Sequence, residues 1–334
     1  MTEEDRREPR GVPVIDLAPF REGDAAARQA VADAVGRACE TTGFLVITGH
    51  GVDQELLDDM WRVTDAFFAL PMAAKQRWTP PGGGLYRGYC SVEGSFPNLV
   101  EQFHASRFDT PEVAVAAGFD PALAATLPSN VWPDEPQDFE SVWKRYFAAM
   151  EHLASTMLAS FATALGLPSG WFDDKVAGHV ANLAANYYPA QSEPPPAGRV
   201  RRAPHTDFGS LTILYQRDGH NGLEVLDVDG TWTMVPALAG TFVVNLGDLM
   251  ARWTNDRWVA TPHRVVNPPR ELASKPRISI PFFQHPDPNA RIECIPTCVT
   301  EDRPCKYEPI RAGDWKEYRM TTYTERAQAA TSSL

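Results

Sequence analysis

After residue 178 the chain becomes a series of short apolar segments separated by turn residues, and this pattern limits the fold most strongly. The segments read LAANYY, LTILYQ, GLEVLDVDGTWTMV, TFVVNLGD, HRVV, RISIPFF and RIECIP. The sequence DVDG at 227–230 lies between two apolar runs, as is typical of a β-hairpin. Many short strands at this spacing predict a sandwich or barrel of the jelly-roll type.

The first half of the chain shows helical periodicity instead. Apolar residues recur at helical spacing over 24–42, 54–70 and 138–165, and a short β-branched run at 44–48 predicts one buried strand. The expected fold is therefore mainly β with flanking helices. We divide it into an N-terminal mixed helical region (1–137) that packs on the core, a catalytic core with a long backbone helix (138–300), and a helical C-terminal segment (301–334).

Charge and composition exclude several classes of partner. The 334 residues carry a formal net charge of −12, which disfavours nucleic acid. No apolar run approaches the roughly 18 residues of a membrane helix, and the charged N-terminus lacks the apolar segment of a secretory signal. We expect a cytoplasmic protein, a monomer or weak homo-oligomer, that acts on a small molecule. The cluster of Cys294, Cys298 and Cys305 lacks the paired spacing of zinc sites.

The sequence PHTDFGSL at 204–211 places His205 and Asp207 two residues apart. On a strand, positions i and i+2 share one face, so the two side chains can bind one metal ion or form an ordinary hydrogen-bonded couple. A second H-x-D occurs at 285–287, but a proline interrupts it and no histidine follows. After the first pair, His263 in TPHRVV offers a third ligand. This order favours His205, Asp207 and His263 as a metal site.

Two histidines and one carboxylate leave neighbouring coordination positions open, which suits non-haem Fe(II) and O₂. In RISIPFF, Arg277 and Ser279 also share one strand face. A guanidinium beside a hydroxyl can bind a carboxylate, although an arginine on an edge strand can equally face water.

Four segments together resemble the isopenicillin N synthase-like family of Fe(II)/2-oxoglutarate-dependent oxygenases. They read HTDFGSLTILYQ, VVNLGDLMARWTNDRWVATPHRVV, RISIPFF and NYYP, and the N-terminal GVPVIDLAPF and GFLVITGHGV are similar to that family's helical region. The resemblance covers about residues 12–296. It implies a double-stranded β-helix core.

The resemblance also implies roles for individual residues. His205, Asp207 and His263 would ligate Fe(II). Arg277 and Ser279 would bind the distal carboxylate of 2-oxoglutarate, and Tyr188 would add a hydroxyl. Asn186 would lie near the carboxylate that chelates iron.

The activity that this implies is a dioxygenase reaction using Fe(II), O₂ and 2-oxoglutarate as co-substrate. It would oxidise an unactivated C–H bond of a small metabolite, such as an amino-acid, peptide or natural-product scaffold. Hydroxylation is the commonest outcome, and desaturation and cyclisation are variants. Three alternatives stay open: an Fe(II) oxidase of the same fold that uses no 2-oxoglutarate, a non-catalytic small-molecule binding protein, and a zinc hydrolase.

Residues that flank the predicted site are candidates for substrate binding. They are Arg87, Tyr89, Phe103, Arg201 and Phe283. The proline-rich loop at 191–202 is expected to form a mobile lid over the site.

Overall fold

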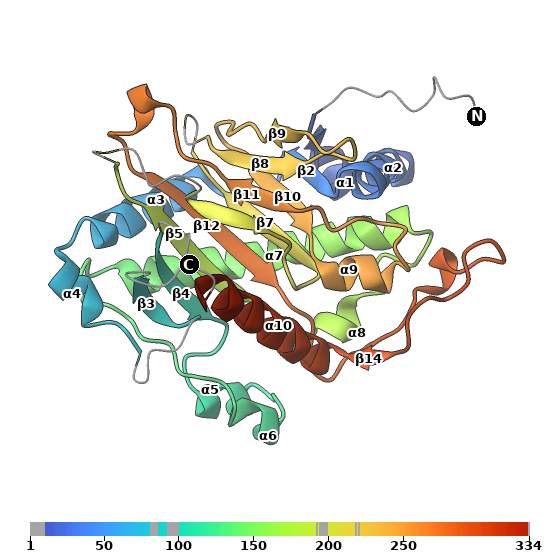
Figure 1. The fold of residues 1–334 in the computed structure, drawn as a ribbon. Coiled ribbons are helices and arrows are strands. Elements are labelled where there is room, and N and C mark those ends of the chain that lie inside the picture. The colour runs from blue at the N-terminus through green and yellow to red at the C-terminus, as the bar shows by residue number, and fades with distance from the viewer. Residues whose placement is uncertain are drawn as a thin grey trace.

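The computed structural model describes residues 11–80, 86–91, 100–191, 193, 200–217, 219 and 221–332, with side chains as far as residue 322. Within this part of the chain the predicted fold class is confirmed, because two β-sheets form the centre and helices flank them (Figure 1).

The larger sheet has the strand order β1-β2-β10-β7-β12-β5-β4-β3, and the smaller has the order β6-β11-β8-β9. The strands of the larger sheet are β1 (Val14–Asp16), β2 (Phe44–Thr48), β3 (Gly88–Ser91), β4 (Glu101–Ser106), β5 (Asn182–Tyr188), β7 (Leu211–Tyr215), β10 (Phe242–Leu246) and β12 (Arg277–Gln284). Those of the smaller are β6 (Arg202–His205), β8 (Leu223–Leu226), β9 (Trp232–Met234) and β11 (His263–Val265). A further pair consists of β13 (Arg291–Ile292) and β14 (Ile310–Arg311).

The helices differ widely in length. They are α1 (Ala18–Glu22), α2 (Ala25–Thr41), α3 (Gln54–Phe68), α4 (Met72–Gln76), α5 (Pro111–Ala116), α6 (Pro121–Ala124), α7 (Phe139–Ala164), α8 (Asp173–Val176), α9 (Asp248–Trp253) and α10 (Ala312–Ser332), with 3₁₀ turns at Arg270–Leu272 and Pro296–Cys298. The predicted helices at 24–42, 54–70 and 138–165 correspond to α2, α3 and α7.

Local sequence explains where these helices begin and end. The Asp24 carboxylate accepts a hydrogen bond from the Ala27 N–H and caps α2, and Asp53 caps α3 in the same way through the Glu55 N–H. Gly43 follows α2 with a φ of 63°, which a side chain would strain, and it also approaches the Val259 carbonyl closely. These signals fix the helices that cover one face of the larger sheet.

The main core lies between the larger sheet and α2, α3 and α7. Helix α7 buries a stripe that includes Tyr146, Met150 and Met157, all fully buried. A second, smaller core of Val12, Phe44, Val46, Leu223, Val225, Val235 and Val243 joins residues of the two sheets. The space between the sheets is therefore the interior of the jelly roll.

Among the described residues, the N-terminal region contributes four strands as well as helices, where the sequence predicted one strand at 44–48. β1 and β2 extend one edge of the larger sheet and β3 and β4 extend the other. Main-chain pairing drives this, as in the antiparallel register of β2 with β10. The described strands β1–β4 and the catalytic core therefore share one sheet.

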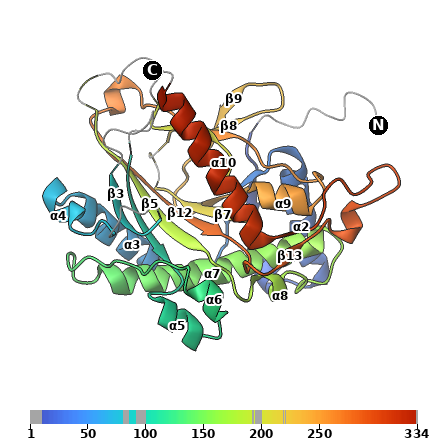
Figure 2. The same ribbon diagram turned by 60° about the horizontal axis from the view of Figure 1, so that its bottom comes forward.

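The C-terminal helix α10 lies across the strands on the side away from α7 (Figures 1 and 2). Its Trp315 Nε1 donates to the Phe208 carbonyl at 3.1 Å, and its Arg319 forms an ion pair with Asp248 at 2.6 Å. These contacts hold α10 beside the segment that carries His205 and Asp207. In the part of the chain that the structure describes, no helix is long and apolar enough to span a bilayer.

Candidate metal centre

Two strands of the smaller sheet bring His205 and His263 together. His205 ends β6 and His263 begins β11, and the two residues are direct partners in the antiparallel register. Their ring centroids lie 4.3 Å apart. Partners opposite each other in a sheet project to the same face, so the pairing explains why residues 58 positions apart meet.

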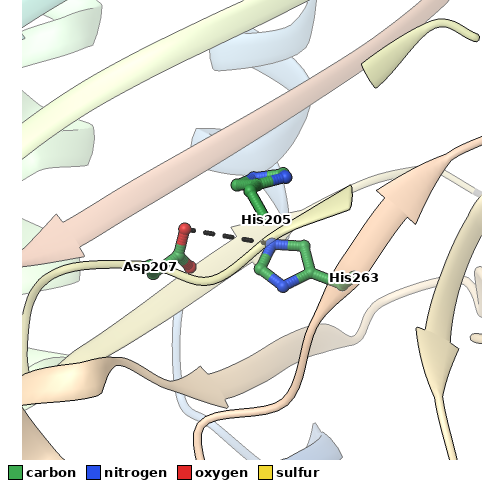
Figure 3. A group of neighbouring side chains, drawn as sticks. All are labelled: His205, Asp207 and His263. Atoms are coloured by element: carbon green, nitrogen blue, oxygen red, sulfur yellow. Dashed lines mark ion pairs between the residues drawn. The ribbon is translucent and has the colours of Figure 1, made fainter. Parts of the chain in front are cut away.

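Asp207 completes the group, and the three side chains converge (Figure 3). It lies beyond the end of β6, so the prediction that it shares a strand face with His205 is wrong in detail. The chain turns after β6, and the Asp207 carbonyl accepts a hydrogen bond from the Asp248 N–H at 2.8 Å. In this conformation the Asp207 carboxylate points toward the histidines. Its Oδ1 lies 3.9 Å from His263 Nε2, and one ligand atom from each residue lies within 4.8 Å of the others.

Two buried side chains orient the Asp207 carboxylate. Thr212 Oγ1 and Asn245 Nδ2 both donate to Asp207 Oδ2, at 2.6 and 2.7 Å. Burial alone would raise the pKa of Asp207, but the nearby histidines and these two hydrogen bonds leave that pKa below its ordinary value. The carboxylate is therefore ionised, and its Oδ1 faces the histidines.

The histidines present their Nε2 atoms to a metal ion. The Nδ1 atoms of His205 and His263 lie 2.8 and 3.3 Å from the carbonyls of Ala203 and Thr261, which assigns the proton to Nδ1 and leaves Nε2 to bind a metal. Burial holds the pKa of His205 well below its ordinary value. Two imidazoles and one carboxylate fit a divalent transition metal such as Fe(II).

Thr212→Val should weaken Fe(II) binding about tenfold, because it removes the hydroxyl that orients Asp207 while keeping the shape of the side chain. Titration of Fe(II) under nitrogen measures the effect. Thr212→Ser keeps the hydroxyl and should bind Fe(II) as the native protein does. Equal affinity in the valine and serine variants would contradict this role.

The predicted carboxylate-binding residues lie on paired strands of the larger sheet. In the β5–β12 register Arg277 faces Tyr188 and Ser279 faces Asn186. Arg277 is 3% exposed, donates to Ser279 Oγ at 3.2 Å and to Gln216 Oε1 at 3.0 Å, and lies over the Tyr188 ring at 5.1 Å. Asn186 accepts a hydrogen bond from Gln102 at 2.6 Å.

Arg201 joins this group, although the sequence suggested it for the substrate. It is 3% exposed, it lies over the Tyr188 ring at 5.8 Å, and its Nε is buried without a hydrogen-bond partner among the described residues. Burial, and then the charge of Arg277, lowers the pKa of Arg201 to about 10. Two buried guanidiniums that repel each other fit a site for an anion such as a dicarboxylate.

A cavity of about 1000 Å³ opens beside the metal centre and is lined by His205 and Asp207. Of the residues suggested for the substrate, Arg87 and Phe283 line this cavity. Tyr89 and Phe103 do not, because they are register partners whose side chains are fully buried against α3 and α7. The prediction that Tyr89 and Phe103 bind the substrate is therefore wrong, and both are core residues.

Several residues of the site and cavity were not foreseen. They are Thr212 and Asn245 beside Asp207, and His104, Lys316 and Met320 in or beside the cavity. Lys316 and Met320 lie one helical turn apart on α10, and that spacing is the only sequence signal that could have paired them. His285 lines the cavity but is not in the metal group. Most of the expected lid, at 192 and 194–199, lies outside the described residues.

Two family models match the chain. The N-terminal model of non-haem dioxygenases in morphine synthesis matches residues 12–135, and the model of the 2OG-Fe(II) oxygenase superfamily matches residues 180–286. The second match contains His205, Asp207, His263, Arg277 and Ser279.

Relatives match over most of the chain. The 2-oxoglutarate-Fe(II) type oxidoreductase hxnY of Emericella nidulans is 33% identical over 319 residues, which cover 92% of this chain and 88% of the relative. Validamycin A dioxygenase of Streptomyces hygroscopicus subsp. limoneus is 32% identical over 292 residues, 84% of this chain and 78% of the relative.

A solved structure is similar over nearly the whole fold. It is the crystal structure of a full-length Neurospora crassa protein in complex with alpha-KG, with a TM-score of 0.82 at 29% identity, and the match covers 95% of this chain and 98% of that one. The same Neurospora crassa protein was also solved with alpha-KG and thymine, a small molecule.

Proposed function

Because the chain belongs to the 2OG-Fe(II) oxygenase superfamily, we propose that it hydroxylates an unactivated C–H bond of a small metabolite. It is an Fe(II)- and 2-oxoglutarate-dependent dioxygenase, and Fe(II), 2-oxoglutarate and O₂ are its cofactor and co-substrates. The zinc hydrolase, the oxidase without 2-oxoglutarate and the non-catalytic binding protein are therefore set aside.

The observation that carries the proposal is the placement of one cavity beside the group formed by His205, Asp207 and His263. These three residues would hold Fe(II), and Arg277, Ser279, Tyr188 and Asn186 would hold 2-oxoglutarate. When bound, the metal and co-substrate supply an oxidation by O₂ that converts 2-oxoglutarate to succinate and CO₂.

The side chains of the cavity would position the substrate and exclude water. Phe208 and Phe283 line the cavity together with Asp207, so an apolar part of the substrate would lie near the metal. Met320 of α10 adds a further apolar side chain to the lining. We expect an amino-acid, peptide or natural-product scaffold as the substrate.

Mass spectrometry of the product tests the reaction type. Metabolites that stimulate succinate formation by the Fe(II)-loaded enzyme are identified first, and each product is then compared with its substrate. Hydroxylation adds one oxygen atom, whereas desaturation or cyclisation removes two hydrogen atoms. A product that gains no oxygen would overturn the assignment of hydroxylation.

Arg201 would act with Arg277 on 2-oxoglutarate, because both guanidiniums are buried beside Tyr188. We expect Arg201→Gln to weaken 2-oxoglutarate binding about tenfold, the loss that follows when a charge-assisted hydrogen bond is removed. Titration under nitrogen measures it. Arg202→Gln is the matched control, because that side chain lines the cavity instead. Equal losses in both variants would contradict the assignment.

The remaining proposals concern the localisation, oligomeric state and partners of the protein. We propose a cytoplasmic enzyme, a monomer or weak homo-oligomer, without nucleic-acid partners. The net charge of −12 supports the last point.

A further inference from the structure

Three cations of the cavity come from separate parts of the chain. Arg87 precedes β3, Arg202 begins β6 and Lys316 lies on α10. Among the described residues, no carboxylate lies within ion-pair distance of any of the three. Of the acidic residues that line the cavity, Asp207 belongs to the metal group, and Asp314 and Glu317 are exposed on α10.

The backbone holds Arg87 toward the cavity. Its Nε donates to the Pro128 carbonyl at 3.1 Å and its Nη1 to the Tyr86 carbonyl at 2.6 Å, so Nη2 is left without a partner among the described residues. Tyr86 has a φ of 82°, which is costly for a tyrosine, and its carbonyl also accepts from Asn182 at 3.3 Å. A buried guanidinium at 7% exposure is thus fixed at the cavity wall.

The charges of these groups interact with one another. The charge of Arg87 adds to the burial that lowers the pKa of Lys316 to about 8. Burial, and then the charges of Arg87 and Arg202, lowers the pKa of His104 to about 4. The cavity therefore gathers mutually repelling positive charge within reach of the metal centre, in a chain whose net charge is −12.

The rest of the cavity wall is largely apolar. Its side chains include Phe119, Leu123, Leu127, Val180, Phe283 and Met320. An apolar wall combined with uncompensated cations is suited to a ligand that has an apolar body and an anionic group.

We propose that the substrate is a small organic acid, whose carboxylate is bound by Arg87, Arg202 and Lys316 while its apolar body lies beside the metal centre. This inference rests on the proposed oxygenase function, whose substrate it narrows. The three residues are substrate-binding and not part of the 2-oxoglutarate site, which lies around Arg277.

Calorimetry with two matched probes tests the subsite. The Fe(II)-loaded protein, saturated with 2-oxoglutarate under nitrogen, is titrated with 2-naphthoate and with 2-naphthamide, which share their apolar body and differ in charge. The native protein should bind 2-naphthoate at least about tenfold more tightly. Arg87→Gln, Arg202→Gln and Lys316→Gln should each remove about tenfold of that affinity and leave 2-naphthamide binding within about twofold.

Two further variants separate charge from structure. Lys316→Arg keeps the cation on a partly exposed helix and should retain 2-naphthoate binding. The Lys316 variants therefore test the subsite even if Arg87→Gln does not fold. Lys275→Gln removes an exposed cation outside the cavity and should change nothing.

The subsite assignment would be overturned if the native protein bound the two probes with equal affinity. It would also be overturned if the variants lost affinity for both probes equally. The affinity for 2-oxoglutarate is measured in the same preparations. Normal 2-oxoglutarate binding without preference for 2-naphthoate overturns the subsite alone. Absence of 2-oxoglutarate binding overturns the co-substrate assignment, and the comparison of the two probes is then made without it.

Discussion

Replacing His263 with alanine should abolish turnover and weaken Fe(II) binding by more than about a hundredfold. His263 supplies one of three protein ligands, and residues that only orient such ligands are already worth about 10- to 100-fold in metal affinity. Its loss leaves His205 and Asp207 alone at the centre. Calorimetric titration of Fe(II) under nitrogen and an assay of succinate formation measure the two effects.

The fold of this variant should persist, because His263 is one side chain at the start of a short strand. Its ring packs against Phe44 at 5.3 Å, so a modest decrease in the melting temperature is expected. His285→Ala is the matched control, since His285 lines the cavity but is not in the metal group. Native-like Fe(II) affinity after loss of His263, or its collapse after loss of His285, would show that the ligands are assigned incorrectly.

Arg277→Lys should raise the KM for 2-oxoglutarate by about ten- to a hundredfold, the cost of one lost charge-assisted hydrogen bond or more. Lysine keeps the positive charge but cannot reproduce the planar fork that contacts Ser279 and Gln216. Steady-state kinetics at saturating substrate and O₂ give the value.

Arg264→Lys provides the comparison for this substitution. Arg264 pairs with Glu224 at 2.7 Å on the smaller sheet, away from Arg277. The KM of the Arg264→Lys variant for 2-oxoglutarate should therefore match that of the native enzyme. If Arg277→Lys leaves the KM unchanged, 2-oxoglutarate is bound elsewhere.

The main strands and helices of this fold are predictable from the sequence because their signals are local. The apolar runs at 211–215, 242–246 and 277–284 form β7, β10 and β12, and the long amphipathic stretch forms α7. The metal ligands were also accessible, because their residue types and order carry the chemistry. Pairing of the N-terminal strands with the larger sheet was not accessible, since no local pattern specifies a distant partner.

The cavity was harder to predict because it depends on side-chain direction. Arg201 and Arg202 are adjacent in sequence, yet one lies over Tyr188 and the other lines the cavity. Tyr89 and Phe103 face the helices, and a slip of one residue in a strand would have exchanged the two faces. Lys316 enters from the C-terminal helix, more than one hundred residues after His205.

Oxygen uptake measured together with succinate formation tests whether the enzyme oxidises its substrate at the expense of 2-oxoglutarate. The Fe(II)-loaded enzyme is supplied with a metabolite that stimulates turnover, with and without 2-oxoglutarate. We expect O₂ to be consumed and succinate to be formed in equal amounts, only when 2-oxoglutarate is present. Oxygen uptake that continues without 2-oxoglutarate, or that yields no succinate, would contradict it.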